Sequence, residues 1–282
     1  MRILLLTILL AFSPLLHAHE GDGGQTVLRP VHAAYTVEAG SAHFADTYLT
    51  PLRYSGWQTT LRYDRMQAMR FDPGRWTMQL DFAATAARTL NPVGNATMWY
   101  WGIDFNWGMM RRLWQRGGLS VMAGGQLDLN LGALYSARNG NNPVAAKAAL
   151  TVGVAGRLGW KGRIGKLPVT LSWQPSLPVT GAFFSPEYGE LYYEIYLGDH
   201  RNLARAAWWG NYFKLDNLIA ADIHFGATSV RVGYRNSYLS TQASHITSRM
   251  ISHCVVIGIS GEWISLNPRK PLSGKAKIIS AL

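Results

Sequence analysis

The sequence predicts an all-β protein, a closed antiparallel transmembrane β-barrel of about twelve strands. Three observations predict this fold. Aromatic residues make up 12% of the 282 residues and charged residues only 15%, which is unusual for a soluble secreted domain. Apolar and polar side chains alternate with a period of two along nearly the whole chain. Many alternating segments also exceed the roughly five or six residues of soluble strands and reach the roughly nine to eleven of a tilted membrane strand.

The first segment, residues 1–18, has the features of a secretory signal peptide. Its apolar core over residues 3–16 follows a basic residue and is too short to span a bilayer comfortably. Ala18 is the small residue expected at the cut, so we expect cleavage there and a secreted mature protein. Cys254 is the only cysteine, and therefore neither a lipid-anchored amino terminus nor an intrachain disulfide is expected.

Three further segments are expected: a periplasmic amino-terminal stretch over residues 19–30, the barrel over 31–265 and a tail over 266–282. The clearest strand covers residues 98–110. One of its faces holds Trp99, Trp101, Ile103, Phe105, Trp107 and Met109, and the other holds Tyr100, Gly102, Asp104, Asn106 and Gly108. Residues 119–136 alternate in the same way, so neither segment fits a helix with one apolar stripe.

A soluble β-sandwich is the alternative fold, because its strands alternate too. The polar faces here are made of Ser, Thr, Gly, Asn, Asp and Arg with almost no lysine, which favours a crowded lumen over a solvated surface. With the amino terminus in the periplasm, the count of about twelve strands requires a periplasmic connection at residues 198–202 and an outward loop at residues 214–217.

The formal charge of +11 is of a size also found in nucleic-acid-binding proteins. Many basic residues, however, fall in short connections and in the tail, as Arg111, Lys161 and Lys275 do. Basic residues at strand ends suit a membrane surface with anionic head groups. We therefore expect outer-membrane lipid and lipopolysaccharide as partners, the barrel-insertion machinery during assembly, and no nucleic acid. A monomer is expected, and a docking role in a larger envelope complex is left open.

Alternation assigns a set of charged side chains to the inside of the barrel, namely Glu38, Arg62, Asp64, Asp81, Asp104, Asp128, Glu194, Asp222, His224, Arg231, Arg235 and Glu262. Charged groups in a narrow interior must be paired or hydrated, so a salt-bridged plug that keeps the barrel shut is the preferred interpretation. A selective pore lined by the same residues is the alternative. The predicted role is therefore envelope structure or small-solute passage.

A lipid-cleaving outer-membrane hydrolase, of the lipid A deacylase or phospholipase type, is a further alternative. Its candidate residues are Ser185, His200, His245 and Ser248. His245 and Ser248 lie three positions apart, which places them on opposite faces of a regular strand, and the sequence holds no Gly-x-Ser-x-Gly motif. No histidine spacing fits a metal site and no glycine pattern fits a nucleotide site, so neither a metal nor a cofactor is expected.

Two stretches, YLTPLRYSGW over residues 48–57 and FFSPEYGELYYEI over residues 183–195, resemble an uncharacterised family of secreted, β-rich outer-envelope proteins from Bacteroidetes. The resemblance extends to residues 231–236 and 253–258. It implies an outer-membrane β-barrel type of protein and brings no established activity. One feature departs from outer-membrane barrels in general, because residues 277–282 lack the terminal aromatic residue on which such barrels commonly end.

Overall fold

The computed structural model describes residues 26–140, 142–187, 189–198, 202–226, 228–264 and 276–282. The predicted signal peptide lies outside these residues. The described chain forms two compact units. One is a small parallel sheet of β1 (Thr26–Leu28) and β13 (Ala276–Ile278). The other is a closed barrel, which also includes residues 279–282.

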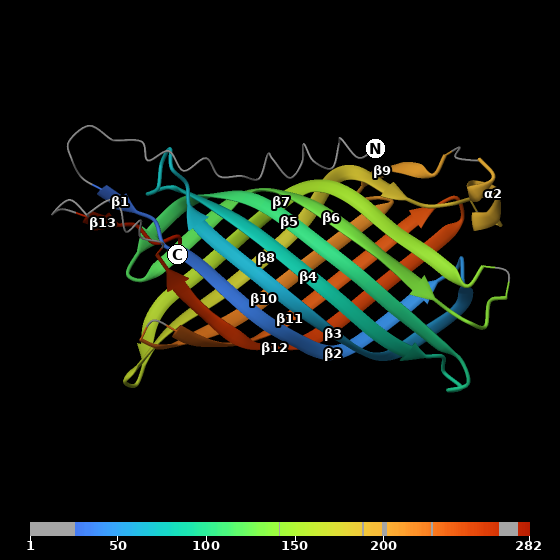
Figure 1. Ribbon diagram of the computed structural model, residues 1–282, viewed down its shortest axis with the longest axis horizontal. Helices are drawn as coiled ribbons and strands as arrows, with labels where there is room; N and C mark the ends of the chain where they lie inside the picture. Colours follow the sequence, from blue (N-terminus) through green and yellow to red (C-terminus); the bar gives the residue numbers. More distant parts are fainter. Residues whose placement is uncertain (1–25, 141, 188, 199–201, 227, 265–275) are drawn as a thin grey trace. The chain divides into compact units, whose positions relative to one another are not determined.

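Ten antiparallel strands close the barrel. In order around it they are β2 (Val31–Asp46), β3 (Thr50–Ala68), β4 (Trp76–Leu90), β5 (Thr97–Arg116), β6 (Leu119–Tyr135), β7 (Val144–Ile164), β8 (Leu167–Phe184), β10 (Tyr212–Phe225), β11 (Thr228–Ala243) and β12 (Ile246–Trp263). The ring is complete because β12 pairs with β2 and β8 pairs with β10. Figure 1 shows these strands wrapping around the barrel with a steep tilt.

The barrel therefore has ten strands, two fewer than the sequence predicted. Both missing strands were expected between residues 185 and 217. Tyr192–Tyr196 forms a short helix, α2, instead, and β9 (Ala204–Trp208) pairs with residues 180–184 of β8, outside the ring. Residues 214–217, expected as a loop, lie within β10. The described elements of the connection from β8 to β10, α2 and β9, thus lie at one end of the barrel (Figure 1), which we call the α2 end.

A local hydrogen bond explains why α2 forms where the sequence pattern favoured a strand. The Glu194 carboxylate accepts a hydrogen bond of 2.9 Å from the backbone N–H of Leu191, at the start of the helix. Such a bond satisfies one of the backbone donors that the first turn leaves free. The opposite end of the barrel holds the turn at residues 117–118 and residues 279–282, and we call it the tail end.

The alternation predicted for residues 98–110 and 119–136 is confirmed in β5 and β6. Outward side chains such as Trp101 and Ile103 are 50% and 48% exposed, whereas the inward Met98 is fully buried. Inward glycines leave room for large neighbours. A Cβ atom on Gly132 would lie 2.7 Å from the hydroxyl of Tyr100, so the tyrosine ring occupies the space that a side chain at residue 132 would fill. Among the described residues, no helix is long and apolar enough to cross a membrane.

Candidate functional site in the barrel lumen

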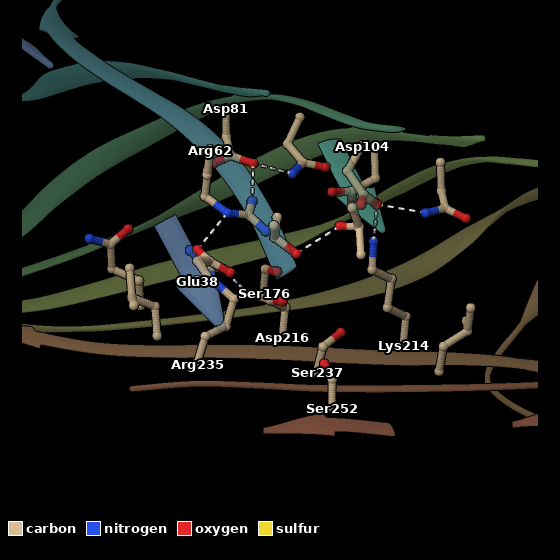
Figure 2. Close-up of a pocket in the computed structure, with 18 of the residues that line it drawn as sticks. Glu38, Arg62, Asp81, Asp104, Ser176, Lys214, Asp216, Arg235, Ser237 and Ser252 are labelled. Carbon is tan, nitrogen blue, oxygen red and sulfur yellow. Dashed lines mark hydrogen bonds and ion pairs between the residues drawn. The ribbon is translucent and has the colours of Figure 1, made fainter. Parts of the chain in front are cut away.

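A chain of ion pairs crosses the middle of the lumen (Figure 2). Arg62 on β3 donates from Nε to Glu38 at 2.9 Å and from Nη1 to Asp81 at 2.5 Å. Glu38 also accepts from Arg235 Nε at 3.0 Å, and Arg235 forms a second ion pair with Asp216. Alternation points all five side chains inward from β2, β3, β4, β10 and β11. Each charge is therefore paired, as burial requires.

Other bonds span the lumen between strands that are not neighbours in the ring. Lys214 on β10 donates from Nζ to Asp104 on β5 at 3.2 Å. Lys147 on β7 forms an ion pair with Asp46 on β2. These two ion pairs hold opposite walls of the barrel together, so the lumen is no wider than one pair of side chains at these levels. The Asp104 carboxylate also accepts a hydrogen bond of 2.6 Å from Asn130, its register partner on the neighbouring strand β6.

An internal cavity of about 130 Å³ remains among these side chains. Its wall holds six carboxylates against three basic side chains, so the cavity is acidic. Among the described residues, two of these carboxylates have side-chain amides as their hydrogen-bond partners and no ion pair. Asp64 accepts from Gln79 Nε2 at 2.6 Å, and Asp128 accepts from Gln126. The cavity is polar and large enough to hold water.

A second charged cluster lies closer to the tail end. Arg231 binds Asp222 through two hydrogen bonds, from Nε to Oδ1 at 2.8 Å and from Nη2 to Oδ2 at 2.9 Å. Ser260 Oγ donates to the same carboxylate at 2.7 Å, and His32 lies 3.3 Å from Arg231 Nη2. This bidentate geometry is the strongest that an arginine and a carboxylate form. The cluster is buried and fully paired, which favours a structural role.

A cluster of buried apolar side chains lies in the lumen at the α2 end. The buried apolar cluster there comprises Ala42, Phe44, Leu49, Tyr54, Ala87, Ala96, Met98, Tyr100, Leu134 and Ala145. The rings of Phe44 and Tyr100 meet edge to face with centroids 5.8 Å apart. We call this cluster the α2-end layer.

A second buried apolar cluster lies at the tail end and includes residues 281–282, whose position the sequence did not predict. Met66, Met110 and Met122 pack with Ala281 and Leu282, and all five are buried. The backbone carbonyl of Ala281 accepts hydrogen bonds from the side chains of Thr77 at 3.2 Å and Arg112 at 3.3 Å. Residues 279–282 therefore occupy the tail end of the lumen, and we call this cluster the tail-end layer.

Most of the side chains predicted to line the lumen do so in the structure. Glu38, Arg62, Asp64, Asp81, Asp104, Asp128, Asp222, Arg231 and Arg235 take part in the contacts described above, and His224 bonds Thr170 at 2.7 Å and Ser229 at 2.6 Å. Alternation along β12 points the Glu262 side chain inward, and its carboxylate accepts a hydrogen bond from Ser280. Glu194 was predicted wrongly, because it lies in α2 and not on a barrel strand.

Sequence reasoning missed several lumen charges. Lys214 and Asp216 fall in the loop predicted at residues 214–217, so their orientation was not considered, and Asp46, Lys147 and the buried Arg157 were not singled out. A more accurate placement of the strand ends would have found the first two, since an inward orientation then follows from alternation.

The predicted catalytic residues are not brought together. Ser185 is buried and donates to the carbonyl of Pro186 at 3.3 Å, while Ser248 is buried in β12. His245 occupies the turn between β11 and β12 with a φ of 63°, a conformation that such two-residue turns require. His200 lies outside the described residues. A serine–histidine contact that the sequence did not reveal joins His43 Nδ1 and Ser55 Oγ at 2.9 Å on the outward face.

No group of three or more His, Cys, Asp and Glu side chains in the described part of the chain is arranged to hold a metal ion.

A family model described as "Protein of unknown function (DUF3316)" matches residues 2–270. No curated protein matches the chain significantly. Similar solved structures include the outer membrane protease OmpT from Escherichia coli, with 7% identity, a TM-score of 0.47, and coverage of 83% of this chain and 97% of that chain. A second is the translocator domain of the autotransporter NalP from Neisseria meningitidis, with 11% identity and a TM-score of 0.37. The match covers 93% of this chain and 96% of that chain. At these values, the activity of neither protein transfers to this chain.

Proposed function

We propose that this chain, which belongs to the DUF3316 family of proteins of unknown function, is an outer-membrane β-barrel whose own side chains shut the lumen. Its role is then in the structure of the envelope rather than in solute passage. The observation that carries this proposal is the combination of an apolar outward face with a lumen that holds ion pairs across its middle and a cluster of buried apolar side chains toward each end.

The outward face supports membrane residence. Central outward residues are strongly exposed, as Leu61 at 60%, Ile257 at 59% and Val152 at 52% illustrate. Water is a poor environment for so many large apolar side chains, and lipid is a good one. On β5 the outward apolar run from Trp99 to Met109 ends at Arg111, and its length matches the roughly nine to eleven residues of a membrane-spanning strand.

The closed lumen supports an envelope role over a pore. Ions passing along the axis would have to cross the α2-end layer, the paired charges of the middle and the tail-end layer. A pore needs a continuous polar path, which the two apolar layers interrupt.

We infer that the α2 end faces the outside of the cell, because the longest connection lies there. Secretion through the predicted signal peptide and the Bacteroidetes origin remain predictions.

Membrane residence is tested by fractionating cells that express the full chain. The protein is expected in the detergent-extracted envelope fraction, with a folded band that shifts on heating before electrophoresis. Recovery in the soluble fraction without a heat-dependent shift would contradict the proposal.

Closure is tested separately with purified protein in planar bilayers. No steady conductance is expected at physiological salt. A reproducible single-channel conductance would contradict closure while leaving membrane residence intact.

A lipid-cleaving hydrolase is a second candidate, on one observation. His43 and Ser55 share a 2.9 Å hydrogen bond on the outward face, near the α2 end. A serine nucleophile needs such a base within hydrogen-bond reach. No carboxylate contacts His43 among the described residues, so the third member of a triad is missing there. Fatty-acid release from phospholipid by the wild type, abolished in Ser55→Ala, would favour this candidate over the structural role.

A further inference from the structure

The barrel separates its charges between its two faces. Every acidic residue of the ten described barrel strands has inward parity, namely Glu38, Asp46, Asp64, Asp81, Asp104, Asp128, Asp216, Asp222 and Glu262. Arginines, by contrast, also occur on the outward face. Charge on the outward face of these strands is therefore positive wherever it occurs, and no carboxylate there neutralises it. Such a surface attracts anions.

Two outward arginines near the α2 end stand on either side of one small residue. Ala45 on β2 is the register partner of Arg53 on β3 and of Arg249 on β12. Strands in a sheet lie about 4.8 Å apart, so the two arginine backbones are about 10 Å apart, with an alanine between them. Both side chains are exposed, and neither guanidinium has a hydrogen-bond or ion-pair partner among the described residues. Both are therefore free to converge on a ligand above Ala45.

The floor of this patch is polar, and an apolar surface continues from it. His43, the next outward residue on β2, is exposed and its ring is held by the 2.9 Å bond to Ser55. Trp57, two residues beyond Ser55 on β3, is 51% exposed on the same face. Below Trp57 begins the outward apolar belt. A ligand on this patch would thus meet cations at one end and apolar side chains at the other.

We propose that Arg53, Arg249 and His43 form a binding site for the phosphate group of a lipid, with the acyl chains lying along the outward face below. The site rests on the membrane placement proposed above. Arginine fits phosphate because its planar guanidinium offers paired donors to two oxygens, and two arginines on one phosphate neutralise its charge. The small side chain of Ala45 leaves the space in which the phosphate sits. A lipid suits the site better than free phosphate because Trp57 continues it toward the apolar belt.

Binding is tested with the full chain purified in detergent, using short-chain phosphatidic acid as the probe and isothermal titration calorimetry as the measurement. Each basic residue at a membrane surface contributes about a fivefold gain in binding to anionic lipid. Arg53→Gln and Arg249→Gln are therefore each expected to weaken binding about fivefold, and the double variant about 25-fold. Ala45→Phe keeps both charges but fills the space between them, and it is expected to weaken binding at least as much as one arginine substitution.

Two matched controls are available on the same surface. Arg88 is outward at the same end, but its guanidinium already lies over the Trp99 ring, 5.7 Å from the centroid. Arg111 is outward at the tail end of β5. Arg88→Gln and Arg111→Gln are expected to leave phosphatidic acid binding unchanged. Diacylglycerol, which lacks the phosphate, is expected to bind far more weakly than phosphatidic acid.

Several outcomes would overturn the site. Equal weakening in Arg88→Gln or Arg111→Gln would indicate diffuse attraction by a basic surface. Binding of inorganic phosphate as tight as that of phosphatidic acid would remove the lipid assignment, and unchanged binding in Ala45→Phe would place the phosphate elsewhere. Each variant is first checked for the heat-dependent gel shift. A wild type that shifts on heating but does not bind phosphatidic acid contradicts this site alone, whereas a soluble wild type contradicts the proposed function as well.

Discussion

Lys214 on β10 reaches across the lumen to Asp104 on β5, with 3.2 Å between Nζ and Oδ1. The two strands are not neighbours in the ring, so this ion pair joins opposite walls of the barrel. Backbone pairing holds each strand only to the next one, whereas this contact holds the two sides of the lumen together. The pair therefore contributes to keeping the lumen closed as well as to stability.

Removing one partner of this pair is expected to cost more than removing both. Lys214→Met leaves Asp104 inside the lumen with only Asn130 as a close partner, and the free energy of unfolding should fall by about 3 to 5 kcal/mol. In the double variant Lys214→Met/Asp104→Leu no charge is left unpaired at this position, so most of that loss should be recovered. Urea unfolding in detergent measures both. Equal losses in the single and double variants would show that the unpaired charge is not the cause.

A charge in the middle of the outward belt should oppose membrane insertion. Ile257 is 59% exposed at the centre of β12, and Ile257→Lys is expected to lower the stability of the inserted barrel by about 2 to 4 kcal/mol, because a lysine there faces lipid. Thr97→Lys is the control, since outward Thr97 lies at the edge of the belt, where the cost is about 0 to 1 kcal/mol. The two variants are compared by unfolding from lipid vesicles. Equal effects would argue against lipid contact at residue 257.

Alternation predicted the strands well where it extends over many residues, and it failed where a short local interaction competes with it. In β5 and β6 the two faces follow the sequence closely. Around Glu194 the same alternation is present, but a five-residue stretch with a capping glutamate forms the helix α2. A periodic pattern also shows which side chains share one face of a strand, but it does not show which strands pair with each other. It could not show that β9 pairs with the last residues of β8, at the α2 end, and leaves the ring at ten strands.

The sequence predicted the candidate site only in part, because alternation shows which side chains face the lumen but not which of them meet. Inward parity identified Glu38, Arg62 and Asp81 as lumen residues, but their pairing depends on the register of three strands, which the sequence does not specify. Lys214 was missed because it was assigned to a loop. The contact between Ala281 and Arg112 joins residues 169 positions apart, and no local pattern predicts such a contact.

A side chain at Gly132 should disturb the α2-end layer. A Cβ atom there would come within 2.7 Å of the Tyr100 hydroxyl, so Gly132→Val has to displace the buried tyrosine ring. Overpacking of this kind costs about 1 to 3 kcal/mol. Gly132→Val/Tyr100→Leu should recover part of the stability, because the smaller side chain makes room, while the backbone oxygen of Trp101 would still lie 2.8 Å from the new Cβ atom. The midpoint of thermal unfolding in detergent measures the series, and a Gly132→Val variant as stable as the wild type would contradict the packing described for Tyr100.

Cys254 offers a direct measure of lumen closure, because the only thiol of the chain lines the central cavity and is 2% exposed. Between the two apolar layers it should react with a charged, membrane-impermeant thiol reagent far more slowly than in the unfolded chain. Phe44→Ala/Tyr100→Ala opens the α2-end layer, and deletion of residues 279–282 opens the tail-end layer. Each change is expected to raise the labelling rate at least tenfold, since the barrier is the packing of the layers and not the reactivity of the thiol.

Cys254→Ser gives the background, and the heat-dependent gel shift confirms that each variant is folded. If wild-type Cys254 is labelled as fast in the folded barrel as in the unfolded chain, the lumen is open to solvent and the plug is not a barrier.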